Sequence, residues 1–120
     1  MKDYHYFKAS ELVCKCGKCD GGEMNYETMA LIAQYRTILN VPLTISSAFR
    51  CPEYNLKVSD TGRNGEHTTG QAVDILIIPK LRYKMLELAF NLKFPRIGLG
   101  KNFIHLGTSK ELPHPTWWTY

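Results

Sequence analysis

The sequence predicts an α+β fold, with a small antiparallel or mixed sheet and flanking helices. Residues 25–39 and 79–92 carry apolar side chains at the helical period of 3.6 residues. Several shorter apolar stretches are typical of strands and do not alternate regularly with the helices. A chain of 120 residues is long enough for one hydrophobic core and too short for two ordinary domains. We therefore expect residues 1–120 to form a single domain.

The first half of the chain supplies a helical turn, a helix and a strand. Ser10 is expected to cap the short helical turn. The helix over 25–39 has Asn25 as its N-cap, and Asn40 ends it. The alternating pattern of Leu43–Phe49 then predicts a strand.

The second half adds the central strand and a second helix. Pro52 is placed to open a short helix, and the turn-rich residues 58–66 predict an exposed loop. Gln71–Ile78 is the expected central strand, and Pro79 opens the second amphipathic helix. Three further stretches are expected to be strands, the last of them at the edge: Arg96–Gly100, Phe103–Leu106 and the tail Pro113–Tyr120.

Composition and charge exclude several classes of protein. The fractions of 44% hydrophobic and 22% charged residues indicate a soluble globular protein. No apolar run approaches the roughly 20 residues that span a bilayer, and the N-terminus lacks the apolar core of a secretory signal, so we expect cytoplasmic synthesis without membrane insertion. The net charge of +4 is spread along the chain, which favours loose attraction to an anionic surface, or simple solubility, over nucleic-acid recognition. We expect a monomer.

The four cysteines are compatible with three different states. Cys14, Cys16 and Cys19 lie in one glycine-rich loop, and Cys51 lies far along the chain, next to Arg50. They would form a structural zinc site, or a disulfide that ties the loop to Cys51, or remain free thiols that pack as small hydrophobic groups. Their spacing does not decide between these states, and it does not favour a catalytic thiol.

A histidine and an aspartate around the central strand indicate a metal site. Asp74 enters an apolar strand, where an unpaired carboxylate costs several kcal/mol. A metal ion shared with His67, seven residues earlier, would compensate that charge, and His105 interrupts a second apolar run. Two imidazoles and one carboxylate leave the fourth position of a tetrahedral zinc ion open, which is typical of hydrolytic sites.

Three segments of the chain together resemble a known family. They are Ser47-Ala48-Phe49-Arg50-Cys51-Pro52-Glu53-Tyr54-Asn55, His67-x-x-Gly70-x-Ala72-x-Asp74, and Phe103-Ile104-His105. In this order they resemble the zinc D-Ala-D-Ala carboxypeptidase and L-Ala-D-Glu endopeptidase superfamily, which has the hedgehog/DD-peptidase fold. The short forms encoded by phages and prophages are the most similar, and the resemblance runs from about Phe7 to Trp118.

The resemblance implies roles for individual residues. It implies that His67, Asp74 and His105 are the zinc ligands. It makes Arg50 the cation beside the metal, where a guanidinium would stabilise an oxyanion or hold a substrate carboxylate. Ser47 is a candidate for a hydrogen bond to substrate, or else a strand hydroxyl bonded to backbone. Trp117 is a candidate wall of the substrate cleft, or else packs at the chain end.

The general base is missing from its expected places. Many members of the superfamily carry a carboxylate three residues before the last histidine ligand, where this chain has Asn102. The short phage-like forms carry one two residues after that histidine, where this chain has Gly107. An amide orients water but does not accept its proton. Glu66, Asp60 and His114 are the candidate substitutes.

The sequence therefore predicts a zinc metallopeptidase of the D,D-carboxypeptidase or endopeptidase type. It would cleave peptidoglycan stem peptides or cross-bridges, as a phage-type endolysin or a virion-associated enzyme that acts on the bacterial cell wall after release. The alternative is a catalytically weak or inactive zinc module that binds peptidoglycan or serves as a structural component of a phage.

Overall fold

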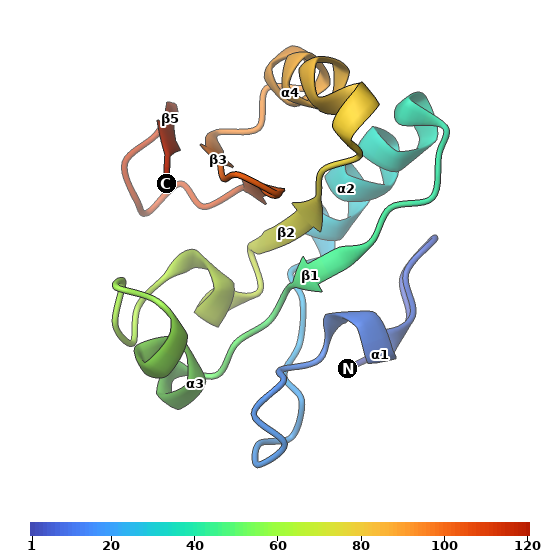
Figure 1. The fold of residues 1–120 in the computed structure, drawn as a ribbon. Coiled ribbons are helices and arrows are strands. Elements are labelled where there is room, and N and C mark those ends of the chain that lie inside the picture. Colours follow the sequence, from blue (N-terminus) through green and yellow to red (C-terminus); the bar gives the residue numbers. More distant parts are fainter.

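A five-stranded sheet runs through the centre of the computed structural model, which describes all 120 residues (Figure 1). The helices are α1 (Ala9–Leu12), α2 (Tyr26–Leu39), α3 (Pro52–Val58) and α4 (Arg82–Asn91), with 3₁₀ turns η1 (Glu66–Thr69) and η2 (Pro79–Leu81). The strands are β1 (Ile45–Ser47), β2 (Ala72–Leu76), β3 (Arg96–Leu99), β4 (Phe103–Gly107) and β5 (Thr116–Thr119). Their order is β1-β2-β4-β3-β5, and all neighbours are antiparallel except β3 and β5. The predicted α+β fold with a mixed sheet is confirmed.

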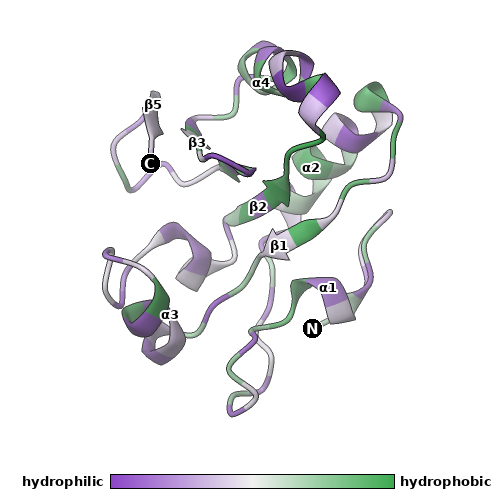
Figure 2. Ribbon diagram, in the orientation of Figure 1, coloured by the Kyte–Doolittle hydropathy of each residue, from purple (hydrophilic) through white to green (hydrophobic).

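One face of the sheet packs against α2 and α4. Both helices lie on the same side of the sheet in Figure 1, and Figure 2 shows apolar residues on β2 and along α2. The hydroxyl of Tyr35 on α2 donates to the carbonyl of Met85 on α4 at 2.8 Å, which ties the two helices together. The central strands contribute four fully buried side chains to the core: Val73, Ile75, Ile104 and Leu106. Because side chains alternate along a strand, the residues between them point to the opposite face.

The helix predicted over 25–39 is confirmed at both ends. The side chain of Asn25 accepts a hydrogen bond from the backbone N–H of Thr28 at 3.0 Å, as an N-cap does. Asn40 adopts a left-handed conformation, with φ of 57°, and ends the helix.

Several predicted elements are shorter than expected. The central strand, predicted over Gln71–Ile78, covers Ala72–Leu76. The strand predicted over Leu43–Phe49 covers only Ile45–Ser47, and its pairing with β2 shifts register between those two residues. The helix expected from Pro79 starts with η2, and its α-helical part begins at Arg82. The tail does add an edge strand, β5, which lies beside β3.

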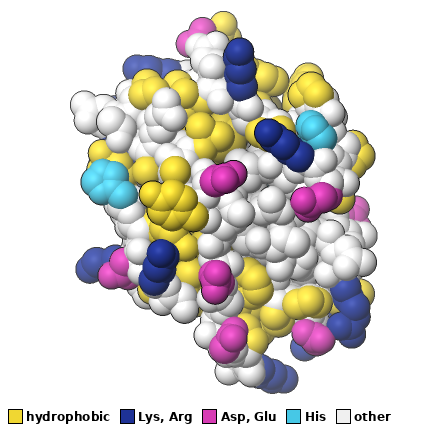
Figure 3. All heavy atoms as spheres, turned by 180° about the vertical axis from the view of Figure 1, so that it is seen from behind, with side chains coloured by type: hydrophobic (Ala, Val, Ile, Leu, Met, Phe, Trp, Pro, Cys, Tyr) yellow, Lys and Arg dark blue, Asp and Glu magenta, His cyan; other side chains and the backbone are white.

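The surface carries charges of both signs. Figure 3 shows Lys and Arg side chains interspersed with Asp and Glu over the face seen from behind, as the scattered charges of the sequence predict. None of the helices combines the length and the apolar character that crossing a bilayer requires.

Candidate metal centre

Asp74 and His105 meet on the sheet face that points away from α2 and α4. They are direct partners in the antiparallel pairing of β2 and β4, so their side chains project to the same side. Asp74 Oδ1 lies 2.9 Å from His105 Nδ1, and both side chains are more than nine-tenths buried. Strand register therefore explains why these two residues, 31 apart in sequence, come together.

His67 reaches the same point from η1, just before β2. Its Nε2 lies 3.3 Å from Asp74 Oδ1. Gly70 ends η1 in a left-handed conformation, with φ of +69°, and a side chain at this position would overlap the backbone of residues 23–24. The glycine between His67 and Asp74 thus permits the turn that brings the histidine back over the strand.

Each histidine has one ring nitrogen held by another group and the other turned towards Asp74. His67 Nδ1 lies 2.6 Å from the carbonyl oxygen of Ala48 and donates to it, while Nε2 faces Asp74. His105 Nε2 lies 2.7 Å from Glu66 Oε1 and donates to it, while Nδ1 faces Asp74 and is the nitrogen that a metal would take up. The two nitrogens that face Asp74 and an oxygen of Asp74 lie within 4.8 Å of one another. These residues fit a zinc ion with three protein ligands.

Arg50 lies beside this cluster and is held by three contacts. Its Nε donates to Ser47 Oγ at 2.9 Å, Nη1 donates to Asn55 Oδ1 at 3.0 Å, and Nη2 pairs with Asp74 Oδ2 at 3.3 Å. Two of its five N–H groups have no protein acceptor. The hydroxyl of Ser47, a residue predicted to bind substrate or backbone, accepts one of these bonds and helps to hold the guanidinium.

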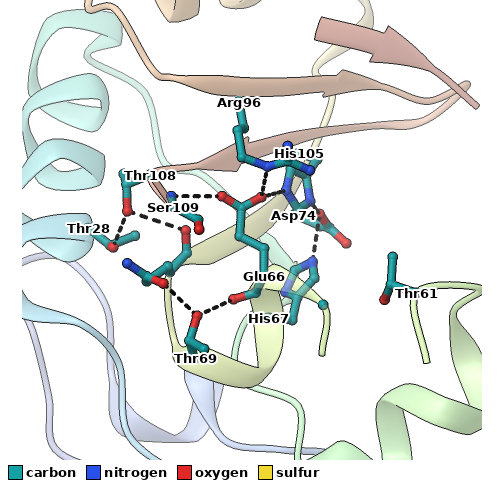
Figure 4. A network of polar contacts seen from close by, with 12 residues as sticks. Thr28, Thr61, Glu66, His67, Thr69, Asp74, Arg96, His105, Thr108 and Ser109 are labelled. Atoms are coloured by element: carbon teal, nitrogen blue, oxygen red, sulfur yellow. Dashed lines mark hydrogen bonds and ion pairs between the residues drawn. The ribbon is translucent and has the colours of Figure 1, made fainter. Parts of the chain in front are cut away.

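Glu66 is buried behind His105, contrary to the exposed loop predicted for residues 58–66. Its carboxylate accepts from Arg96 Nε at 3.0 Å and from the backbone N–H of Ser109 at 3.0 Å, besides the bond from His105 (Figure 4). No local sequence pattern signals this burial, because the partners come from β3, β4 and the loop after it.

Gly107 leaves the space that the Glu66 carboxylate occupies. A Cβ atom at this position would overlap that carboxylate directly. The position where the short phage-like forms carry a carboxylate therefore lacks a side chain here, and the carboxylate of Glu66 lies against it.

The ionisation of the three central groups follows from their contacts. Burial by itself would raise the pKa of Asp74, but hydrogen bonds from His105 and His67 hold it well below its usual range. Burial would likewise raise the pKa of Glu66, but His105, Ser109 and Arg96 lower it. Burial by itself would lower the pKa of His105, yet Asp74 and Glu66 raise it.

A pocket of about 720 Å³ opens in front of this cluster. Its wall includes Arg50, Trp118 and Tyr120 besides the candidate ligands. Trp118 packs 5.3 Å from the ring of His105, whereas Trp117 packs against Phe90 at 6.3 Å and is 54% exposed. The prediction that Trp117 lines the cleft is therefore wrong by one residue, because neighbouring side chains of β5 point to opposite sides.

The candidate general bases differ in position. Asp60 and Glu66 line the pocket, and His114 does not. Asn102 is exposed in the turn between β3 and β4, also outside the pocket. Asp60 is exposed and has no ion pair or side-chain hydrogen bond, whereas both oxygens of Glu66 already accept hydrogen bonds.

Two imidazole nitrogens and a carboxylate, with an arginine and a pocket before them, define the class of metal-dependent hydrolases. Residues 5–107 match the family model described as Peptidase M15, and the chain belongs to this family. M15 peptidases bind zinc, and the protein is a metallopeptidase by family. A search of curated proteins finds no matching sequence. β5, which brings Trp118 to the pocket, lies outside the matched segment.

Proposed function

We propose that the protein is a zinc-dependent peptidase that cleaves peptidoglycan peptides, as a D,D-carboxypeptidase or endopeptidase. The observation that carries this proposal is the donor set of His67, Asp74 and His105, which opens onto a pocket with a fixed arginine. When bound by these residues, zinc supplies a Lewis acid that polarises a peptide carbonyl. The protein's own residues bind and orient the peptide at that point.

Arg50 is the group we expect to bind the substrate. Contacts with three side chains hold its guanidinium, so little conformational entropy remains to be lost when a substrate binds. Its two unoccupied N–H groups suit a substrate carboxylate or the negative charge that develops on a carbonyl oxygen. A peptide that ends in D-Ala presents both features within a few bonds of each other.

A carboxylate of the pocket wall would accept the proton of the attacking water. Glu66 is engaged by His105, Arg96 and Ser109, so its role is to orient the His105 ring. Asp60 has no such partners, and we propose it as the group that accepts the proton. Asp60→Asn is expected to lower kcat about 10²–10⁴-fold at unchanged zinc content. An unchanged kcat would exclude Asp60 from this role.

The net charge of +4 favours adsorption to an anionic bacterial wall. We propose that the protein, as a monomer, acts on that wall after release, as a phage-type endolysin or a virion-associated enzyme.

Digestion of purified sacculi tests the peptidase activity. We expect zinc-loaded protein to release new amino termini or free D-Ala, and protein treated with chelator to release neither until zinc is restored. Identification of the released fragments by mass spectrometry distinguishes a carboxypeptidase from an endopeptidase. Zinc-loaded protein that releases nothing from sacculi of either wall type would contradict the proposal.

A second function is favoured by the engagement of Glu66. Both of its oxygens are occupied, and neither Asn102 nor Gly107 supplies a carboxylate. A zinc module that binds peptidoglycan with little or no turnover fits these facts. It predicts that zinc-loaded protein sediments with sacculi without cleaving them, and that Arg50→Ala abolishes this binding.

A further inference from the structure

The four cysteines form a second cluster, away from the pocket. Cys14, Cys16 and Cys19 come from the loop after α1, and Cys51 immediately precedes α3. Their sulfur atoms all lie within 4.8 Å of one another, and those of Cys16 and Cys51 are 3.9 Å apart. Four sulfurs at about 2.3 Å from a tetrahedral zinc ion would be about 3.8 Å apart. The cluster therefore has nearly the dimensions of a tetrathiolate site.

The backbone around the cluster favours ionised sulfur. Each of the four sulfur atoms accepts one backbone N–H at 3.3–3.4 Å. The N–H of Cys51 donates to the sulfur of Cys14, and that of Lys18 donates to Cys16. The N–H of Gly21 donates to Cys19, and that of Tyr54 donates to Cys51. A thiolate accepts such a bond more strongly than a neutral thiol does, and the thiolate is the form that binds metal.

Three lysines lie beside the cluster. Lys15, Lys18 and Lys57 line a hollow together with three of the cysteines and a single carboxylate, that of Glu53. A zinc ion with four thiolates carries two excess negative charges, and nearby ammonium groups reduce the cost of holding them.

Neither disulfides nor free packed thiols fit the arrangement of the sulfur atoms as well as a metal does. Disulfides would arrange the sulfurs as two separate pairs, whereas here all four are mutual neighbours and none is bonded. Cysteines that pack as small hydrophobic groups would all be buried, yet Cys19 is exposed and Cys16 is only half-buried.

We propose that Cys14, Cys16, Cys19 and Cys51 bind one structural zinc ion, separate from the metal of the peptidase site. With four protein ligands this site has no open position for a substrate. The zinc would affect the pocket by fixing Cys51, which follows Arg50 in the chain and is the N-cap of α3. α3 also carries Asn55, an acceptor of the Arg50 guanidinium. The zinc thus ties the loop of residues 14–21 to the segment that holds the arginine.

Metal content of the full-length protein gives the first test. After purification under reducing conditions, we expect two zinc ions per chain in the wild type and one in Cys16→Ser. The control Lys84→Ser, at an exposed position of α4 that lines neither hollow, keeps two. One zinc in the wild type that Cys16→Ser loses would place the metal at the cysteines alone and leave this proposal standing. A zinc content that Cys16→Ser does not lower overturns it.

Cobalt substitution identifies the ligands, and it applies even where Cys16→Ser fails to fold. His105→Ala keeps all four cysteines, so its cobalt form should show intense visible bands and sulfur-to-cobalt charge transfer in the near ultraviolet. Cobalt without these bands, or disulfides among these cysteines in the unreduced protein, overturns the proposal. An inactive wild type that shows the bands contradicts the peptidase function and leaves the cysteine site standing.

Discussion

The histidine cluster and the cysteine cluster each gather metal-binding side chains, but they are built differently. His67, Asp74 and His105 come from the sheet and the turn before it, and further side chains and a backbone carbonyl fix their orientation. The cysteines come from loops, and their sulfur atoms are contacted by backbone N–H groups.

We expect this difference to separate a site that reacts from a site that only binds. Three ligands leave a coordination position that faces a pocket, and buried charges around them tune each group. Four thiolates close the coordination sphere, and lysines need only balance their charge. The first cluster therefore has to be rigid and polar, whereas the second has only to hold two segments together.

Loss of a ligand should break the first cluster and spare the second. We expect His105→Ala to lose all peptidase activity, because it removes a zinc ligand and leaves Glu66 without its imidazole partner. The assay is release of amino termini from sacculi. His114→Ala, which changes an exposed histidine outside the pocket, should keep wild-type activity. Normal turnover by His105→Ala would remove the histidine cluster from the reaction.

Replacement of Arg50 by lysine tests whether a rigid guanidinium is required. A lysine keeps the charge but loses the fork that donates to Ser47 and Asn55 while two N–H groups remain free. We expect Arg50→Lys to lower kcat/KM about 10²–10³-fold, the usual effect of losing a group that stabilises developing negative charge. Arg63→Lys, on the exposed loop, should change kcat/KM little. Equal kcat/KM for both variants would exclude a catalytic role for Arg50.

Glu66→Gln should weaken zinc binding about 10–100-fold, as loss of a hydrogen-bond partner of a metal ligand commonly does. The amide offers His105 Nε2 a weaker acceptor than the carboxylate. Competition with a chromophoric chelator measures the affinity. Zinc affinity equal to that of the wild type would show that Glu66 does not orient His105.

The space at Gly107 offers a matched double variant. Gly107→Asp alone should destabilise the protein, because its side chain would overlap the carboxylate of Glu66. Combination with Glu66→Ser removes that overlap, and part of the stability and zinc affinity should return. Thermal unfolding and chelator competition on the wild type, the two single variants and the double variant measure the coupling between positions 66 and 107.

The metal-free and zinc-loaded proteins should respond oppositely to pH. The raised pKa of His105 means that its contribution to stability is fully present below about pH 6.5, the unfolded value, and is lost as pH rises through the folded pKa. The unfolding temperature of metal-free protein should therefore fall as pH rises above about 6.5. Zinc requires neutral imidazoles, so its stabilising effect should grow over the same range. Parallel curves for the two forms would contradict this expectation.

The smallest effect concerns the pocket wall. Trp118→Ala should raise KM by about tenfold or less, since an aromatic contact contributes about 0.5–1.5 kcal/mol. Trp117→Ala is the matched control, because its side chain lies against Phe90 outside the pocket. A larger effect from Trp117→Ala would reverse the assignment.

The sequence determined the parts of the molecule that depend on local pattern. The N-cap at Asn25, the stop at Asn40 and the apolar runs of β2 and β4 follow from residue type and spacing. Asp74 and His105 were recognisable as candidate ligands because each is a polar residue within an apolar strand, and Arg50 followed from its motif.

Only the tertiary structure decided what surrounds these residues. Pairing of β2 with β4 places Asp74 opposite His105, and packing of η1 against β4 buries Glu66 at the space left by Gly107. The register of β5 turns Trp118 toward His105 instead of Trp117. The spacing of the cysteines left their state open, and only folding brings Cys51 to the loop that carries the other three. Such contacts join residues far apart in the chain, so no local periodicity or spacing records them.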